Sequence, residues 1–136
     1  MAPGKAKTHN KETGGLGEEV ACIYLERRGF TVVDRNYTKP WGEIDIVAEK
    51  DGIVHFIEVK AVSRGTFDDG SRESDYRPEE LATRAKLHKV SRTATLYMES
   101  KRDEREYQVD VIGVLLDQEK KVARCRFFDQ ALESNM

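Results

Sequence analysis

Residues 42–60, GEIDIVAEKDGIVHFIEVK, place charged side chains at regular intervals among isoleucine and valine. The segments 42–49 and 53–60 each have the β-branched, alternating pattern that is typical of a β-strand. The KDG sequence between them is a signal for a tight hairpin turn, with Asp51 and Gly52 at its centre. The stretch therefore predicts two antiparallel strands joined in a hairpin.

The register of this hairpin brings charged residues together. Asp45 lies opposite Glu58, and Glu43 lies opposite Lys60, if Asp51 and Gly52 form the turn. Side chains alternate between the faces of a strand, so these four charged residues are expected to share one face. The other face is expected to carry the apolar residues Ile44, Ile46, Ala48, Ile57 and Val59. A shift of one residue would mix the two sets, which favours this register.

The sequence around the hairpin predicts further elements in the order αβββαββ. These are a helix over residues 16–28, a strand over 30–37, a helix that begins at Pro78 and ends near Glu99, and strands over 107–116 and 120–128. An apolar stripe on the second helix comprises Leu87, Val90, Ala94 and Tyr97. The strands on either side of this helix form a βαβ unit and are expected to be parallel, which gives a mixed sheet.

The bulk composition suits one cytoplasmic domain. The chain has 136 residues, of which 1–13 are expected to be a flexible tail and 14–136 a single domain. Its formal net charge of −2 gives no overall basic signal, so a nucleic-acid partner would require a local patch. Cys22 and Cys125 lack zinc-binding spacing and are expected to be free thiols. The polar N-terminus has no signal peptide, and the longest apolar stretch is too short to span a membrane.

The charged face of the hairpin has two interpretations. Asp45 and Glu58 would repel each other unless a positive group lies nearby, and either Lys60 or a divalent cation could supply that charge. The simpler alternative is a salt-bridged cluster on a face exposed to solvent. Glu18, at the start of the first helix, lies at the edge of the apolar stripe formed by Ala21, Cys22 and Leu25. It could join the carboxylates, or it could complement the helix N-terminus.

GEIDIV followed by IEVK resembles the active-site strands of the PD-(D/E)xK nuclease superfamily. The segments GGLGEEVACIYLERRGFTVVDRNY and RAKLHKVSRTATLYM, together with FIEVK and YQVDVIGV, are similar to one branch, the YraN-like family of small bacterial proteins assigned as endonucleases. The resemblance implies an α/β fold with a restriction-endonuclease-like αβββαβ core, a mixed central sheet and flanking helices. It also implies Glu18, Asp45, Glu58 and Lys60 as catalytic residues.

The activity implied by this resemblance is metal-dependent hydrolysis of nucleic acid, most simply DNA. Mg²⁺ or Mn²⁺ would be held by Asp45, Glu58, the Val59 carbonyl and Glu18, whereas Glu43 has no settled role. Candidate phosphate contacts are Arg64, Arg84, Lys86 and Lys89, although a solvated helix face explains each helix residue equally well.

Other functions remain open at this stage. The same fold could be a non-catalytic nucleic-acid-binding or assembly module, or a small metal-binding or protein-interaction domain. Trp41 could stack on a base, but packing on the edge of the domain is the favoured interpretation. No membrane partner is expected, and the sequence leaves open whether the chain is a monomer or a homodimer.

Overall fold

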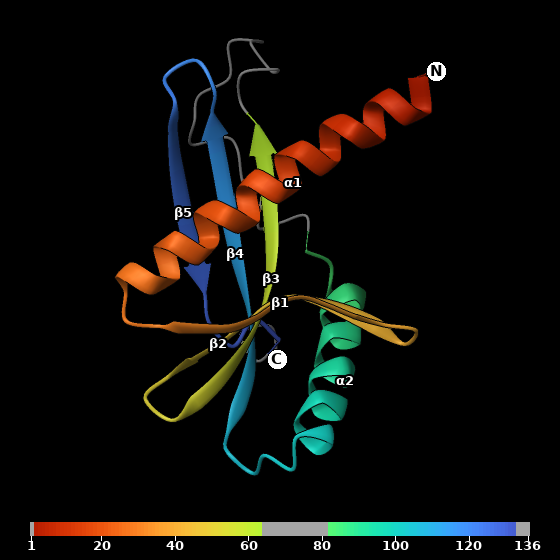
Figure 1. Ribbon diagram of the computed structural model, residues 1–136, viewed down its shortest axis with the longest axis vertical. Helices are drawn as coiled ribbons and strands as arrows, with labels where there is room; N and C mark the ends of the chain where they lie inside the picture. Colours follow the sequence, from red (N-terminus) through yellow and green to blue (C-terminus); the bar gives the residue numbers. More distant parts are fainter. Residues whose placement is uncertain (1, 64–81, 133–136) are drawn as a thin grey trace.

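The computed structural model describes residues 2–63 and 82–132, and for residues 2–14 it describes the backbone alone. Figure 1 shows a sheet crossed by one helix on its near side, with a second helix on its far side. The elements are α1 (Ala2–Arg27), β1 (Thr31–Lys39), β2 (Gly42–Lys50), β3 (Ile53–Ser63), α2 (Arg84–Ser100), β4 (Tyr107–Asp117) and β5 (Val122–Phe128).

The five strands form one sheet in the order β1-β2-β3-β4-β5. β3 and β4 are parallel, and every other neighbouring pair is antiparallel. The αβββαββ order, the mixed sheet and the parallel pair joined through α2 are therefore confirmed. The parallel pair follows from the crossover, because a strand that returns through a helix on one face runs in its original direction.

Two apolar cores lie on opposite faces of this sheet. On the α2 side, Phe56 and Val47 belong to one cluster with the four residues predicted to form the apolar stripe of α2. On the α1 side, Ile57 and Ile112 belong to a second cluster with Leu25. The central strands β3 and β4 are buried on both faces, which explains why their sequences are nearly continuous runs of apolar residues.

The predicted hairpin register is confirmed near the turn. Lys50 pairs with Ile53 and Ile46 pairs with Ile57. Asp51 and Gly52 both have positive φ, at 52° and 79°. Two successive positive φ angles are the requirement of a type I′ turn, whose twist matches that of the strands.

The prediction of a single apolar hairpin face is wrong at Ile44. Ile44 belongs to the α2-side cluster, whereas Ile46 belongs to the α1-side cluster. Residues two apart point to the same face of a regular strand, so β2 changes faces at Asp45. The reason is tertiary: a Cβ on Gly42 would overlap the hydroxyl of Thr93, so the end of the β1–β2 hairpin is pressed against α2.

The first helix extends further than predicted at its N-terminal end. α1 begins at Ala2, within the segment 1–13 that was expected to be a tail, and Figure 1 shows its first turns projecting past the sheet. Where α1 crosses β3, a Cβ on Gly17 would lie 2.5 Å from the Cβ of Ala61. Glycine allows this close approach of the two backbones. Once this packed part of α1 has formed, further helical turns can be added toward the N-terminus at low free-energy cost, since nucleation is the costly step of helix formation.

The second helix begins later than predicted within the part of the chain that the structure describes. Thr83 is its N-cap, and the Thr83 hydroxyl accepts a hydrogen bond from the backbone N–H of Lys86 at 3.2 Å. The predicted start at Pro78 lies outside the described residues. The helix ends at Ser100, one residue beyond the prediction.

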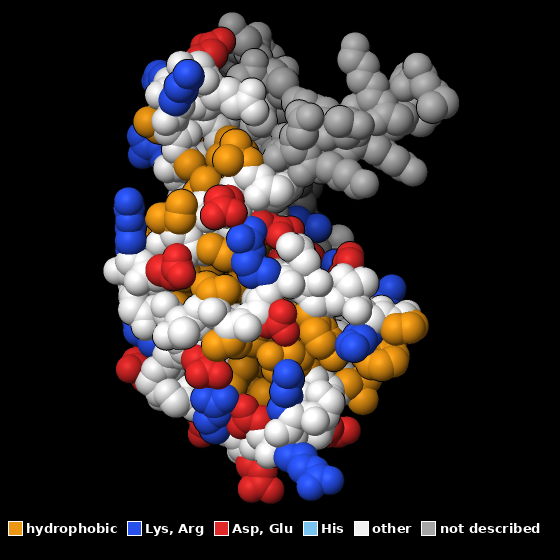
Figure 2. Space-filling model, viewed as in Figure 1, with side chains coloured by type: hydrophobic (Ala, Val, Ile, Leu, Met, Phe, Trp, Pro, Cys, Tyr) orange, Lys and Arg blue, Asp and Glu red, His pale blue; other side chains and the backbone are white. Residues whose placement is uncertain are grey.

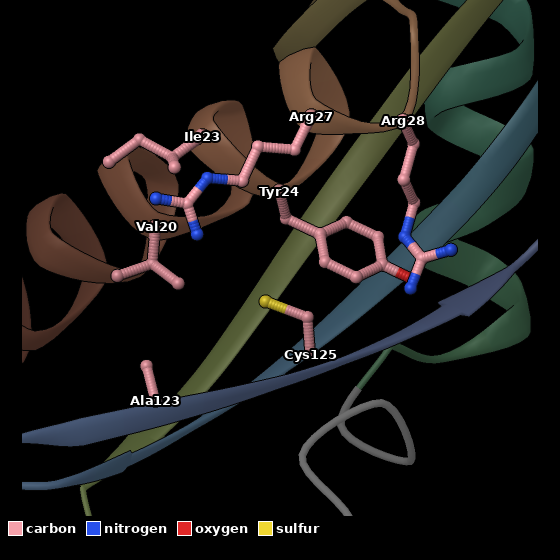
Figure 3. Close-up of a pocket in the computed structure, with 7 residues that line it drawn as sticks. All are labelled: Val20, Ile23, Tyr24, Arg27, Arg28, Ala123 and Cys125. Carbon is pink, nitrogen blue, oxygen red and sulfur yellow. The ribbon is translucent and has the colours of Figure 1, made fainter.

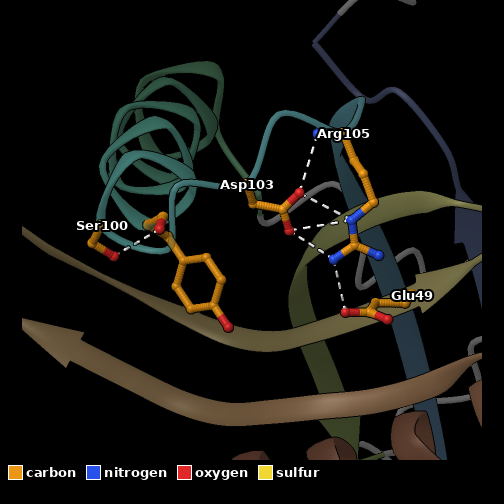
Figure 4. Close-up of polar contacts among 5 residues, drawn as sticks. Glu49, Ser100, Asp103 and Arg105 are labelled. Atoms are coloured by element: carbon orange, nitrogen blue, oxygen red, sulfur yellow. Dashed lines mark hydrogen bonds and ion pairs between the residues drawn. The ribbon is translucent and has the colours of Figure 1, made fainter.

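Polar side chains fix the loop between α2 and β4. Arg105 binds Asp103, with 2.6 Å between Nη2 and Oδ2, and reaches Glu49 of β2 at 3.1 Å (Figure 4). At the end of α2, the Ser100 hydroxyl donates a hydrogen bond to the carbonyl of Tyr97. The loop is thereby tied to the β2–β3 hairpin.

His55 of β3 is buried against Asp110 of β4. The distance from His55 Nδ1 to Asp110 Oδ2 is 2.6 Å. The other carboxylate oxygen of Asp110 accepts hydrogen bonds from the Gln108 side chain and the Gln130 backbone N–H. A carboxyl group that is 0% exposed therefore has partners for both oxygens, as buried polar atoms require.

Candidate active site

Asp45 lies where β2 separates from β3. The described ladder between these strands ends at Ile46 and Ile57. Beyond it, Asp45 Oδ2 accepts a hydrogen bond from the backbone N–H of Val59 at 2.8 Å. The side chain of Asp45 thus takes the place of a strand acceptor, which holds its carboxylate against β3.

Glu58 is the buried partner of Asp45. Its side chain is only 3% exposed. Burial raises the pKa of the Glu58 carboxyl to about 8, and the charge of Asp45 and a hydrogen bond with Asp45 act in the same direction. The ammonium groups of Lys60 and Lys86 lower this pKa but do not offset the other causes. Two carboxyl groups in contact, one largely removed from water, form a site that favours a proton or a cation.

Lys60 projects beside Glu58 from the same strand. Its Nζ lies 3.6 Å from Glu58 Oε2. The predicted cross-strand pair of Glu43 with Lys60 is wrong, because β2 has left β3 at that point. Glu43 instead forms an ion pair with Lys86 of α2, at 3.8 Å between Oε1 and Nζ. Lys60 is therefore associated with the carboxylate pair rather than neutralised by Glu43.

Glu18 approaches the same site from α1. The residues predicted to form its apolar stripe, Ala21, Cys22 and Leu25, are buried, and Glu18 is half-buried at their edge. Burial raises the pKa of the Glu18 carboxyl, and the charge of Asp45 raises it further. The influence of Asp45 on Glu18 indicates that α1 brings a third carboxyl group near the site.

Asn36 is a site residue that sequence reasoning missed. It has φ of 52°, in the left-handed region, and a hydrogen bond from its side chain lowers the pKa of Glu18. It lies between Arg35 and Tyr37, which pair with Ile46 and Ile44, and so stands beside Asp45. An asparagine within a predicted strand was the available signal, because asparagine tolerates this conformation better than most residues.

Among the described residues, no group of three or more His, Cys, Asp or Glu side chains is placed to hold a metal ion. The carboxylate donors in contact are the pair Asp45 and Glu58. This donor set fits a hard cation such as Mg²⁺, which usually binds one or two carboxylates and keeps several waters. It does not suit zinc, which prefers four tightly held nitrogen or sulfur ligands.

Three of the four predicted phosphate contacts, Arg84, Lys86 and Lys89, lie in the N-terminal half of α2. Arg84 and Lys89 are exposed, whereas Lys86 is half-buried and paired with Glu43. Arg64 lies outside the described residues. Of the three described residues, Lys86 is the one whose charge lowers the pKa of Glu58.

A separate groove runs between α1 and β5, away from these residues. It has a volume of about 610 Å³ and is lined by Val20, Ile23, Tyr24, Arg27, Arg28, Ala123 and Cys125 (Figure 3). It contains none of the predicted catalytic residues. Cys125 and the buried Cys22 are both free, as predicted, and burial raises the pKa of each thiol.

No helix in the described part of the chain is long and apolar enough to cross a membrane.

Comparison with known proteins gives a consistent family. The sequence model of the family described as "Uncharacterised protein family UPF0102" matches residues 17–114. A UPF0102 protein of Campylobacter jejuni is 38% identical over 104 residues, which cover 76% of this chain and 84% of that protein. One of Dictyoglomus thermophilum is 35% identical over 115 residues, covering 84% and 91%. One of a Sulfurovum species is 39% identical over 106 residues, covering 77% and 85%. The chain therefore belongs to the UPF0102 family.

Proposed function

We propose that this protein is a metal-dependent endonuclease that hydrolyses phosphodiester bonds, with DNA as the substrate. The observation that carries the proposal is the contact between Asp45 and Glu58 at the point where β2 leaves β3, with Lys60 beside it. Burying a pair of carboxylates costs folding free energy. Groups with such shifted pKa values are concentrated at functional sites. The αβββαββ order also agrees with the restriction-endonuclease-like core that the PD-(D/E)xK resemblance implies.

Asp45 and Glu58 would hold Mg²⁺ or Mn²⁺, with the Val59 carbonyl as a further ligand. When bound, such a cation lowers the pKa of its water and offsets negative charge on the phosphate. The hydrogen bond from the Val59 N–H orients Asp45, so the carboxylate is held in place before any cation arrives. Glu18, held by Asn36, would complete the acidic surface from α1.

Lys60 is the residue assigned to act on the reacting groups. Its ammonium lies 3.6 Å from Glu58, where it could orient the attacking water or donate to a phosphate oxygen. Glu43 is given no catalytic role, because its carboxylate is engaged by Lys86.

Substrate binding is assigned to the exposed cations Arg84 and Lys89 on α2. Lys89 follows Lys86 by three residues and so lies on the same face of α2, and Lys86 lowers the pKa of Glu58, so this face leads toward the carboxylate pair. This local charge is needed, because the net charge of −2 would not attract a polyanion.

The test is a cleavage assay on single-stranded, duplex, flap and four-way-junction DNA, each with Mg²⁺, Mn²⁺ or EDTA. Wild type is expected to cleave only with metal. Lys60→Met keeps the apolar stem of the side chain and is expected to lower the rate by roughly two to three orders of magnitude. The affinity of this variant for DNA is expected to change little, since a single ion pair between a lysine and a phosphate at the surface contributes about 1 kcal/mol or less.

The matched control is Lys120→Met, in the turn between β4 and β5, which is expected to cleave at the wild-type rate. If wild type binds DNA but cleaves none of the substrates with any metal, the nuclease assignment fails and a non-catalytic binding module replaces it.

A further inference from the structure

The end of the β1–β2 hairpin presents an aromatic side chain to solvent. Trp41 is 51% exposed, so about half of its side chain is open to solvent. It is the only tryptophan in the chain. Figure 2 shows hydrophobic side chains gathered beside Lys or Arg at the place where Figure 1 has the end of this hairpin.

The position of Trp41 is fixed by its neighbour. Gly42 approaches Thr93 of α2 so closely that a side chain at position 42 would overlap the threonine hydroxyl. Thr93 is itself 1% exposed, and its hydroxyl donates to the carbonyl of Lys89 at 2.9 Å. The indole is thus carried on a backbone that is packed against a helix, which lowers the entropy lost when a ligand binds it.

Positive side chains connect this position with the carboxylate pair. Lys86, Lys89 and Thr93 are spaced by three and four residues, so they lie along one face of α2. Thr93 contacts Gly42, next to Trp41, and Lys86 pairs with Glu43. A chain of phosphates that follows this face would pass from the indole toward Asp45.

The spacing suits a nucleic acid strand. Trp41 lies in the turn before β2 and precedes Asp45 by four residues, which is at most about 13 Å along the chain. That separation corresponds to several stacked nucleotides at about 3.4 Å each. In an intact duplex, the neighbouring base pairs cover the faces of each base, whereas an unpaired base leaves its face free for an aromatic side chain.

We infer that Trp41 is a stacking platform for an unpaired base, and that the substrate carries a single-stranded segment next to the phosphate at Asp45 and Glu58. The inference rests on the proposed function. It narrows the substrate class to single strands, flaps, gaps or frayed ends, and excludes uninterrupted duplex.

Tryptophan emission of the full-length protein tests the inference without any cleavage. In EDTA, fluorescein-labelled oligo-dT and a duplex of equal length are titrated, and anisotropy of the label reports binding. Because Trp41 is the sole tryptophan, its emission reports on the hairpin alone. Single-stranded DNA is expected to quench the emission, and duplex bound to the same extent is expected to leave it unchanged.

Trp41→Ala is expected to weaken binding of oligo-dT by about 5- to 150-fold and to leave duplex binding within twofold, whereas Trp41→Phe retains most of the affinity. The control is Phe128→Ala, an exposed aromatic on the opposite edge strand, which is expected to bind both DNAs normally. Circular dichroism melts check that each variant is folded.

Bound DNA with unchanged emission, or unchanged affinity in Trp41→Ala, would overturn the stacking role while leaving the nuclease proposal standing. Equal quenching by duplex would overturn the substrate class. Absence of binding to every nucleic acid would overturn both this inference and the proposed function.

Discussion

Glu58 joins two properties that conflict at neutral pH. It is almost fully buried, and it touches another carboxyl group. In the folded protein the pKa of Glu58 is about 8, so its carboxyl group keeps its proton up to about that pH. In the unfolded chain the same group has its ordinary pKa of about 4.3 and loses the proton above that pH. The folded state therefore holds more protons than the unfolded state between those two values, and the contribution of Glu58 to stability falls as pH rises across this window.

We predict that the metal-free protein loses up to about 4 kcal/mol of stability from this group between pH 5 and pH 8.5. Glu58→Gln cannot titrate and still offers a donor to Asp45, so its stability is expected to change less over the same range. Urea denaturation in EDTA at both pH values measures the difference. Parallel pH dependence in the two proteins would show that Glu58 is ionised in the fold.

At the level of single residues, the sequence predicted which carboxylates lie together but not the residues that surround them. Asp45 and Glu58 could be paired because a turn of known type fixes the hairpin register. Asn36 could not be placed, because its role depends on a left-handed backbone and on a helix that arrives from elsewhere. The ion pair between Glu43 and Lys86 was missed for the same reason, since it forms only where β2 leaves its partner strand.

At the level of elements, β3 and β4 are held together by more than their ladder. His55 on β3 binds Asp110 on β4, and Asp110 also accepts from Gln108 and Gln130. The strand positions were predictable from periodicity. The pairing of His55 was not, because its partner is 55 residues away and the two strands meet only after α2 has crossed the sheet.

We predict that Asp110→Ala destabilises the fold by about 3 to 5 kcal/mol, since it leaves the buried His55 and the part-buried donors of Gln108 and Gln130 without their acceptor. Asp110→Asn keeps one acceptor oxygen and is expected to lose less. Urea denaturation measures both, and Glu119→Ala, on the exposed turn after β4, is expected to lie within about 0.5 kcal/mol of wild type. An Asp110→Ala protein as stable as that control would show that the cluster is dispensable.

Packing between elements also explains why β2 changes faces at Asp45. Local sequence favours one uninterrupted amphipathic hairpin, and the local pattern is correct from Ile46 to the turn. Packing of Gly42 on Thr93 then outweighs it, because it buries Ile44 against α2 instead of α1. The deviation coincides with Asp45, and the candidate site lies where tertiary packing overrides the strand period.

At the level of the whole molecule, the two helices lie on opposite faces of the sheet, and each contributes a residue near the place where β2 leaves β3. α1 supplies Glu18 and α2 supplies Lys86, and the strands between them supply Asp45, Glu58 and Lys60. A site assembled from every layer of the molecule exists only in the folded protein. A cation that binds it must therefore stabilise the fold.

We predict that Mn²⁺ or Mg²⁺ raises the melting temperature of wild type, with a shift that grows with metal concentration. Asp45→Asn is expected to lose most of the shift, because it removes one carboxylate of the pair. Differential scanning fluorimetry with and without EDTA measures the shift in melting temperature. Ca²⁺ is tested in the same way as a further hard cation. Equal shifts in both proteins would place metal binding elsewhere.

The parallel pairing of β3 and β4 has a consequence for the order of synthesis. β1, β2 and β3 are neighbours in the chain and can form their meander as soon as they leave the ribosome. The strand that covers the other edge of β3 is made later: Asp110 follows His55 by 55 residues, or about 3 to 11 s at 5 to 20 residues per second. During that interval the open edge of β3 presents unpaired backbone N–H and C=O groups, to which another extended chain can add. A chain interrupted before Tyr107 lacks the strand that would protect it.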